Sequence, residues 1–464
     1  MELLIIVVFI VGYLGITLEH NIKLDKLIPA LAMMAICWAI VALGIDSFSN
    51  WFDSSNHALV EGFTEMAHDD KMHLAEETLL HHLGKTAEIL VFLLGAMTIV
   101  EIIDYFNGFS TIKGYVKTNS KKKILWIFSI LAFILSAIID NLTATIVLIS
   151  ILQKIVKMRE DRIWFAGLII IAANAGGAFS PIGDVTTTML WIGDKVSTGM
   201  LFTYLFIPSL LCMVVPTFIA TFLPAFKGDI SFDENEVEKP KSQHSAKMLY
   251  LGLGAILFVP VFKTVTHLPP YVGMMLSLGI VATFAEIYSR TKFYLTDFDS
   301  DTSNSNAHHS PVHASLSKIE MPSILFFLGI LMAVAALESL GILFNFAESL
   351  KQGIPLMGSE LDGTLVSDLV VLLLGGGSAV IDNVPLVAAS LGMFSEPLDN
   401  PLWHFIAFSA GTGGSMLIIG SAAGVVAMGM EKIDFFWYLK KISWLALIGF
   451  LIGSAAFVVL RAFI

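Results

Sequence analysis

Long apolar stretches with almost no charged residues recur along the whole chain, and many reach the ~18 residues that suffice to cross a bilayer. Hydrophobic residues make up 56% of the sequence and charged residues only 14%, whereas soluble domains carry about 25% charged residues. Inside hydrocarbon every backbone polar group needs an internal hydrogen bond, so only helices and closed barrels span membranes. Because the stretches have helical length, we expect an all-α polytopic membrane protein with about ten spans.

One stretch of nine residues occurs twice, as Ser136–Ala144 and as Ser378–Leu386, each time within an apolar segment. Each copy holds an acid-amide pair, Asp140–Asn141 in the first and Asp382–Asn383 in the second. A carboxylate inside a membrane is costly, so such a residue usually marks an ion or substrate pathway. Asp and Asn are also good helix N-caps and would suit a broken helix. We favour a functional site, because a cap alone can use an uncharged serine.

A second match between the two halves indicates an internal duplication. Gly176–Gly177 corresponds to Gly413–Gly414, at nearly the same separation as the two Asp-Asn pairs. We therefore expect two repeats, residues 1–224 and 248–464, joined by a charged cytoplasmic linker at 225–247. Internal repeats of this kind are common in secondary transporters.

Charged residues beside the two Asp-Asn segments predict how each segment enters the membrane. Basic residues flank the first segment, 124–156, and acidic residues flank the second, 365–394. Because basic flanks mark the cytoplasmic side, both ends of the first segment should be inside and both ends of the second outside. An arm of about 15 residues is about 22 Å long, too short for a core of ~30 Å, so we expect two re-entrant helical hairpins with the pairs at their tips. The basic flanks are Lys121, Lys122, Lys123, Lys154, Lys157, Arg159 and Arg162, and the acidic flanks are Glu360, Asp362, Asp368, Glu396 and Asp399.

A glycine-interrupted helix follows each hairpin. The first spans 163–192 and is interrupted at Asn174–Asp184, and the second spans 404–427 and is interrupted at Gly411–Ser421. One hairpin from each side, with a broken helix after each, is an inverted-topology repeat, and in such transporters the substrate site lies at the midplane between the repeats. We expect the same here.

Oxygen donors gather at the hairpin tips and at the helix interruptions. Carboxylate, amide and hydroxyl oxygens suit hard cations, whereas zinc and copper prefer thiolate and imidazole ligands. The sequence therefore predicts a site for a transported cation and no resident cofactor. The candidate ion- and proton-binding residues are Asp140, Asn141, Thr143, Asn174, Asp184, Ser378, Asp382, Asn383, Thr412 and Ser415.

Asp184 breaks the symmetry between the halves, because Ser421 stands at the matching position of the second half. The first repeat is therefore the more acidic one. Burial disfavours a bare charge on a carboxylate, so a proton or a cation has to neutralise it. A proton and a cation then compete for one site, which is the physical requirement of an exchanger.

Four motifs give the chain a family resemblance: His81–Gly84, Glu88–Thr98, the two Asp-Asn tips, and Asn174–Trp191 with its Gly-Asp-Val-Thr-Thr-Thr run. Together they resemble the NhaD-type sodium/proton antiporters of the ion transporter superfamily. The resemblance implies exchange of Na⁺ or Li⁺ for H⁺ across a bacterial inner membrane, by a homodimer whose transport domain moves like an elevator against a scaffold domain. It also implies that Na⁺ is bound by Asp140, Asn141, Asp184, Asp382 and Asn383.

Three other functions compete with cation exchange. An anion transporter of the same architecture, for arsenite or dicarboxylates, is disfavoured because two aspartates would repel the anion. A channel is disfavoured because two closed hairpins suit alternating access better. An enzyme is disfavoured because no nucleophile-base or metal signature appears. The net charge of −12 also argues against a nucleic-acid partner.

The remaining polar segments are predicted to lie outside the membrane core. We expect Asp46–Lys85, which carries several histidines, to be a solvated external loop, and Ser289–Lys318 to be a flexible one. Asp104 and Glu338, near span ends, should be interfacial. The short connection that carries Lys23 and Lys26 should lie on the cytoplasmic side.

Overall fold

The computed structural model describes residues 1–17, 19–53, 58–113, 118–230, 244–296, 310–353, 366–380 and 382–464. Within these ranges the regular structure is helical apart from β1 (Phe52–Asp53) and β2 (Ala58–Leu59), an antiparallel pair. The acidic flanks Glu360 and Asp362, and much of the two charged loops at 225–247 and 289–318, lie outside the described residues.

The first half of the chain contains ten α-helices within the described residues, and a kink or break separates several of them. Its α-helices are α1 (Glu2–Thr17), α2 (Glu19–Ile22), α3 (Leu27–Leu43), α4 (His68–Tyr105), α5 (Ser110–Lys113), α6 (Lys121–Ile139), α7 (Asn141–Ile155), α8 (Arg159–Ala178), α9 (Val185–Ile192) and α10 (Thr198–Ala220). Its 3-10 helices are η1 (Ile45–Ser47), η2 (Phe63–Glu65) and η3 (Pro224–Phe226).

The second half continues in the same way. Its helices are α11 (Ser245–Thr266), α12 (Pro270–Thr296), α13 (Pro311–Leu316), α14 (Met321–Ser339), α15 (Ile342–Gly353), α16 (Asp368–Ser378), α17 (Asn383–Met393), α18 (Pro401–Gly413), α19 (Ala422–Glu431), α20 (Phe435–Lys441) and α21 (Ser443–Arg461). The helix breaks therefore lie at both Asp-Asn pairs and at both predicted interruptions.

Seven helices of the described residues are long and apolar enough to cross a membrane: α4, α6, α10, α11, α12, α14 and α21. Shorter apolar helices include α1, α3, α7, α16, α17 and α19. A helical, multi-pass membrane protein is thereby confirmed, whereas the inverted repeat and the re-entrant hairpins stay predictions. The arms also differ in length, because α6 has 19 residues and α16 and α17 have 11 each. α6 is longer than the expected arm because it already begins at Lys121. The long side chains of the lysine run can reach polar surroundings while the helix continues into the apolar region.

The expectation of a loop throughout Asp46–Lys85 was wrong for its second part. From His68 onward this segment forms the first turns of the 38-residue helix α4. Asp69 and Asp70 lie in the first turn, where negative charge is favourable beside the positive end of the helix dipole. Ala75 packs inward while the other face stays polar, so the segment is an extension of a membrane helix beyond its apolar part.

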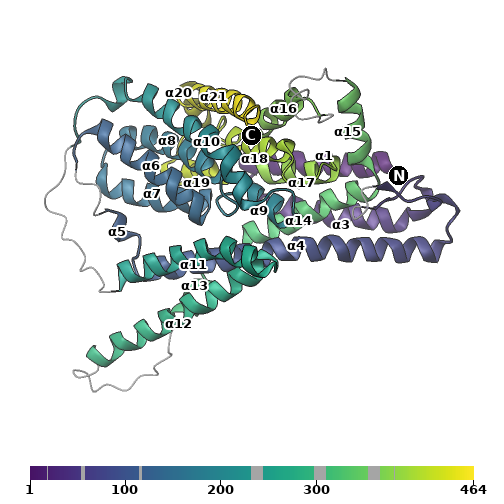
Figure 1. The fold of residues 1–464 in the computed structure, drawn as a ribbon, viewed down its shortest axis with the longest axis horizontal. Coiled ribbons are helices and arrows are strands. Elements are labelled where there is room, and N and C mark those ends of the chain that lie inside the picture. Colours follow the sequence, from purple (N-terminus) through teal and green to yellow (C-terminus); the bar gives the residue numbers. More distant parts are fainter. Residues whose placement is uncertain are drawn as a thin grey trace.

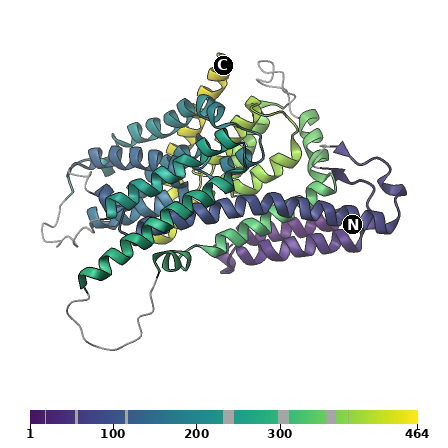
Figure 2. The ribbon, with the colours of Figure 1, turned by 60° about the horizontal axis from the view of Figure 1, so that its bottom comes forward.

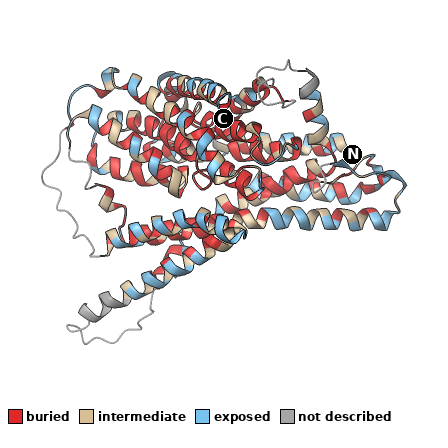
Figure 3. Cartoon of the chain, viewed as in Figure 1, coloured by how far each residue is buried: buried red, intermediate tan, exposed pale blue. Residues whose placement is uncertain are grey.

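The helices pack in two groups, each drawn from both halves of the sequence (Figures 1 and 2). In the α4 group, α1, α3, α4 and α14 lie side by side, and α11, α12 and α13 pack against α4. In the α8 group, α6, α7, α8, α9 and α10 pack with α16, α17, α18, α19 and α21. Contacts of α14 with α17, of α4 with α9 and of α11 with α6 join the two groups. Figure 3 shows that buried residues concentrate in the α8 group, while α12 extends away and carries a mixture of buried, intermediate and exposed residues.

The two interruptions repeat the same close backbone approaches. A Cβ added to Gly176 would clash with the backbone of Phe133, and one added to Gly413 would clash with the backbone of Gly375. Only glycine permits two backbones to come this close. Such paired approaches at matching positions support the predicted duplication and fix the two broken helices against α6 and α16.

Candidate functional site

Each Asp-Asn pair lies at a helix break, with the aspartate as the N-cap of the following helix. Asp140 separates α6 from α7 and has φ 89°, an uncommon conformation for a residue other than glycine. Its carboxylate accepts hydrogen bonds from the backbone N–H and from the hydroxyl of Thr143, both at 2.8 Å. Asp382 caps α17, although its carboxylate lies 3.5 Å from the N–H of Val384. Each aspartate therefore caps a helix, and the side chain of the asparagine after it is not needed for the cap.

Both asparagines donate to one carboxylate, that of Asp184. Nδ2 of Asn141 lies 2.7 Å from Oδ2 of Asp184, and Nδ2 of Asn383 lies 3.1 Å from the same oxygen. Asp184 is only 2% exposed. The two halves of the chain thus meet at a single buried acid, which comes from the first interruption.

The start of α9 holds the carboxylate of Asp184 in place. Oδ1 of Asp184 accepts from the backbone N–H and from the hydroxyl of Thr186, both at 2.9 Å. Asp184 is the N-cap of α9, so the unpaired N–H groups of the first helical turn face it. Among the described residues, every hydrogen bond of this carboxylate comes from a donor group, as expected for a negative charge stabilised without water.

Asn174 extends the network to the second interruption. Its Oδ1 accepts from Nδ2 of Asn141 at 3.0 Å, and its own Nδ2 donates to Oγ of Ser421 at 3.0 Å. Ser421 caps α19 in the way that Asp184 caps α9. The residue pair that breaks the sequence symmetry therefore sits in one hydrogen-bonded chain that runs from Ser421 to Asp184.

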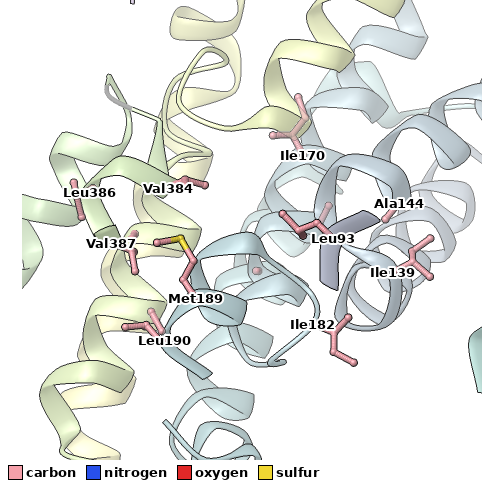
Figure 4. Close-up of a cluster of buried hydrophobic side chains, with 14 of the residues drawn as sticks. Leu93, Ile139, Ala144, Ile170, Ile182, Met189, Leu190, Val384, Leu386 and Val387 are labelled. Atoms are coloured by element: carbon pink, nitrogen blue, oxygen red, sulfur yellow. The ribbon is translucent and has the colours of Figure 1, made fainter. Parts of the chain in front are cut away.

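Buried apolar side chains lie beside the network residues in sequence, and Figure 4 draws several of them. Ile139 and Ala144 flank the first pair, Val384 and Val387 follow the second, and Ile182 precedes Asp184. All five are buried, and α9 packs against α17 beside them. Because apolar walls exclude water, the polar groups inside have to satisfy one another or bind an ion.

The two tip aspartates face different surroundings. A cavity of about 360 Å³ reaches Thr143, the partner of Asp140. Its polar lining residues are Glu101, Asp104, Asn107, Ser110, Thr143, Ser150, Lys154, Lys318 and Glu320. Asp382 instead pairs with Lys26, whose Nζ lies 3.5 Å from Oδ2. Among the described residues, no hydrogen bond joins the carboxylate of Asp140 or of Asp382 to that of Asp184.

The other predicted site residues bond to backbone groups. The hydroxyl of Ser378 donates to the carbonyl of Ala410 at 2.6 Å, and that of Thr412 donates within its own helix to Phe408 at 2.6 Å. The hydroxyl of Ser415 donates to the carbonyl of Thr412 at 2.6 Å. The hydroxyls of these three residues bond within the second half of the chain, and none of them donates to Asp184. Among the described residues, no group of three or more His, Cys, Asp or Glu side chains is arranged so that it could hold a metal ion.

Sequence reasoning did not place Thr186 or Lys26 in the site. The run of three threonines directly after Asp184 was the available signal for Thr186, because a threonine two residues after an N-cap aspartate can return a hydrogen bond. No comparable signal existed for Lys26, which reaches the site from the opposite end of the sequence.

Two contacts join the halves of the chain away from Asp184, one an ion pair and one a hydrogen bond. Arg162, at the start of α8, bonds through Nε to both carboxylate oxygens of Glu431, at 3.0 Å each. In the other half, Asp399 accepts from the N–H of Ser197 at 2.6 Å and lies 3.4 Å from Nε2 of His404. Burial alone would raise the pKa of Asp399, but the nearby imidazole of His404 and the hydrogen bond from Ser197 outweigh burial and hold the pKa below its ordinary value.

Comparison with known proteins places these residues in a family context. A family model described as "Citrate transporter" (CitMHS) matches residues 6–397. The sodium/proton antiporter 1 of Arabidopsis thaliana is 41% identical over 453 residues, which cover 97% of this chain and 71% of that protein. The sodium/proton antiporter 2 of the same plant is 36% identical, covering 98% and 99%. The Na(+)/H(+) antiporter NhaD of Vibrio parahaemolyticus is 32% identical, covering 82% and 91%.

Proposed function

The chain belongs to the CitMHS family and, within it, to the NhaD-type Na⁺/H⁺ antiporters, and from this premise we propose that it exchanges Na⁺ or Li⁺ for H⁺ across a membrane. The observation that carries the proposal is the convergence of Asn141 and Asn383 on the buried carboxylate of Asp184. An uncompensated carboxylate in hydrocarbon is costly, so either a proton or a cation neutralises it. Because one carboxylate accepts one or the other, entry of Na⁺ expels H⁺.

The asparagines act in both states of the site. An asparagine carries an NH₂ group that donates and a carbonyl oxygen that accepts. The NH₂ groups of Asn141 and Asn383 stabilise the bare carboxylate of Asp184, and their carbonyl oxygens are suitable ligands for Na⁺. In this proposal Asp140 and Asp382 add negative charge at the two tips and attract the incoming cation.

We propose that the protein works by alternating access of an elevator type, as a homodimer. The separation of the helices into the α4 group and the α8 group supports a scaffold and a transport domain. The cavity beside Thr143 is lined by Lys154, which belongs to the flank predicted to be cytoplasmic, so we assign it as the cytoplasmic entrance. The bacterial relatives named NhaD support a place in a bacterial inner membrane.

Proton flux in everted vesicles tests the proposal. A pH-sensitive dye should report proton release on addition of Na⁺ or Li⁺, and not on addition of choline. Asp184→Asn should reduce this response to background, and Asp140→Asn should reduce it strongly. Asp194→Asn is the matched control, because Asp194 is also near α9 but its side chain is 78% exposed. Full exchange in Asp184→Asn would contradict the site.

A second candidate function is anion transport with the same architecture, and the description of the family model as a citrate transporter favours it. The same vesicles should then respond to citrate, a dicarboxylate or arsenite. We expect no such response, because Asp140, Asp184 and Asp382 present three acids to the entering anion.

A further inference from the structure

Lys26 is the residue that the proposed exchange leaves unexplained. It precedes α3, in the α4 group, yet its ammonium lies 3.5 Å from Oδ2 of Asp382 at the second tip. The two side chains are 20% and 14% exposed. A lysine placed only for topology would extend to water, so its position against a tip carboxylate requires another reason.

Lys26 is the cationic partner of Asp382, and the contacts around the pair support this assignment. The Nζ atom of Lys26 lies 4.5 Å from the ring centre of Phe326 on α14, a buried cation–π contact that guides the side chain inward. The hydroxyl of Tyr13, on α1, is buried and has no hydrogen-bond partner among the described residues, so it does not donate to Asp382. Lys26 is therefore the group that neutralises Asp382 in this structure.

The Lys26–Asp382 pair is loose compared with a structural pair on the same helix–break–helix unit. At the start of α16, Asp368 receives two hydrogen bonds from the guanidinium of Arg461, at 2.7 and 2.5 Å. That bidentate contact is typical of a fixed pair. Lys26 makes one contact at 3.5 Å, through a point charge on a flexible stem. Arg461 therefore fixes one end of this unit more firmly than Lys26 fixes the other.

We propose that Lys26 is a tethered cation that occupies Asp382 when no transported cation is bound, and that Na⁺ displaces it. The inference rests on the proposed Na⁺/H⁺ exchange and adds a positioning residue to it. Lys26 belongs to the α4 group and Asp382 to the α8 group, so the pair also joins the two groups in the cation-free state. Binding of Na⁺ breaks this link and frees the α8 group to move.

Acetylation of Lys26 tests the pair directly. Full-length protein in vesicles is treated briefly with acetic anhydride, and modification of each lysine is measured by mass spectrometry. Asp382→Asn should raise the modification of Lys26 about threefold with no Na⁺ present, because the ammonium loses its partner. Lys23, which is exposed in the same connection, is the internal control and should not change. An unchanged Lys26 in Asp382→Asn overturns the proposal.

Addition of Na⁺ to the unmodified protein tests the displacement. Na⁺ should raise acetylation of Lys26 about threefold relative to choline at the same ionic strength, and leave Lys23 unchanged. If Asp382→Asn frees Lys26 but Na⁺ does not, the pair is structural and the proposal fails. If vesicles show no Na⁺-driven proton flux at all, the proposed function fails, while the Asp382→Asn result still decides whether the pair exists.

Transport kinetics provide a second measurement. Lys26→Gln should lower the apparent KM for Na⁺ about threefold at alkaline pH, because Na⁺ no longer competes with a tethered charge. Lys23→Gln should keep the KM of the parent. A raised or unchanged KM in Lys26→Gln, with normal amounts of protein in the membrane, would overturn the competition.

Discussion

The interruption between α8 and α9 and the one between α18 and α19 are built on matching backbone contacts but carry different polar groups. In both, a serine of the preceding segment donates to a backbone carbonyl at 2.6 Å, Ser136 to Ala173 and Ser378 to Ala410. Asp184 caps α9, whereas Ser421 caps α19. The two interruptions therefore share their backbone contacts, and the capping side chain, Asp184 or Ser421, determines which of them holds a carboxylate.

The same division applies to the two tips. Asp140 satisfies its carboxylate within its own helix through Thr143, whereas Asp382 takes its partner from the other helix group through Lys26. The two asparagines, by contrast, do the same task and donate to Asp184. The two asparagines therefore make equivalent hydrogen bonds, whereas the two tip aspartates differ in the group that pairs with their charge. The predictions below test this division, in order of decreasing effect.

Gly176→Ala and Gly413→Ala should each remove most of the folded protein from the membrane. A methyl group at either position would overlap the backbone of Phe133 or Gly375, and overpacking typically costs about 1–3 kcal/mol or more. Detergent-solubilised amounts measured by size exclusion check this. Gly429→Ala is the control, since no heavy atom lies within 4 Å of the added Cβ. Loss with only one of the two variants would break the equivalence of the interruptions.

Asn141→Ala and Asn383→Ala should lower the kcat/KM for Na⁺ by similar factors. Each removes a hydrogen bond to the charged carboxylate of Asp184, worth about 1.5–3 kcal/mol, or roughly 10- to 150-fold. Sodium-dependent proton flux at several Na⁺ concentrations measures the effect. A large loss of kcat/KM in one variant and none in the other would show that the asparagine of only one half stabilises Asp184.

The sequence predicted the backbone better than the charge pairing. Glycine pairs and Asp-Asn pairs mark helix breaks through local conformational rules, so the breaks at Asp140, Asp184 and Asp382 were found. Pairing of Asp184 with both asparagines needs contacts between segments that are far apart in the chain, and only the repeat suggested it. Lys26 has no local signal, because its role depends on how α3 packs against α14.

The polar extension of α4 shows a second limit of sequence reasoning. Histidines and acids in 68–85 suggested a loop, but helix propensity and the acidic first turn favour a continued helix. Composition reports solvent exposure, and it does not separate an exposed helix from a loop. Repeat orientation stays a prediction for a related reason, because it rests on flanking charge rather than on packing.

Ser421→Ala should reduce exchange only about two- to tenfold, because it removes one neutral hydrogen bond from Asn174 and the N-cap of α19, and no charge. The expected ratio of this effect to that of the Asp184→Asn variant measures how unequal the two interruptions are. Ser454→Ala in α21 is the matched control, since its buried hydroxyl has no hydrogen-bond partner among the described residues. A loss as complete as that of Asp184→Asn would mean that both interruptions bind the ion.

The smallest expected effect is on thermal stability and concerns Asp399, which lies between α17 and α18. Its pKa lies below the ordinary 3.8 in the folded protein, so its carboxylate stabilises the fold above the unfolded pKa and loses this contribution as the pH falls through the folded pKa. Asp399→Asn keeps the backbone at φ 60°, which asparagine tolerates, and should lower the Tm at pH 7 by about 1–2 °C.

The difference in Tm between this variant and the parent should narrow as the pH falls below 3.8, because the parent then loses the same charge. Thermal unfolding of the purified protein between pH 7 and pH 3 measures it. Asp434→Asn is the control, because the carboxylate of Asp434, like that of Asp399, accepts a hydrogen bond from one backbone N–H. A difference in Tm that persists unchanged at low pH would show that the hydrogen bond from the N–H of Ser197, and not the charge of Asp399, joins the α17–α18 connection to α10.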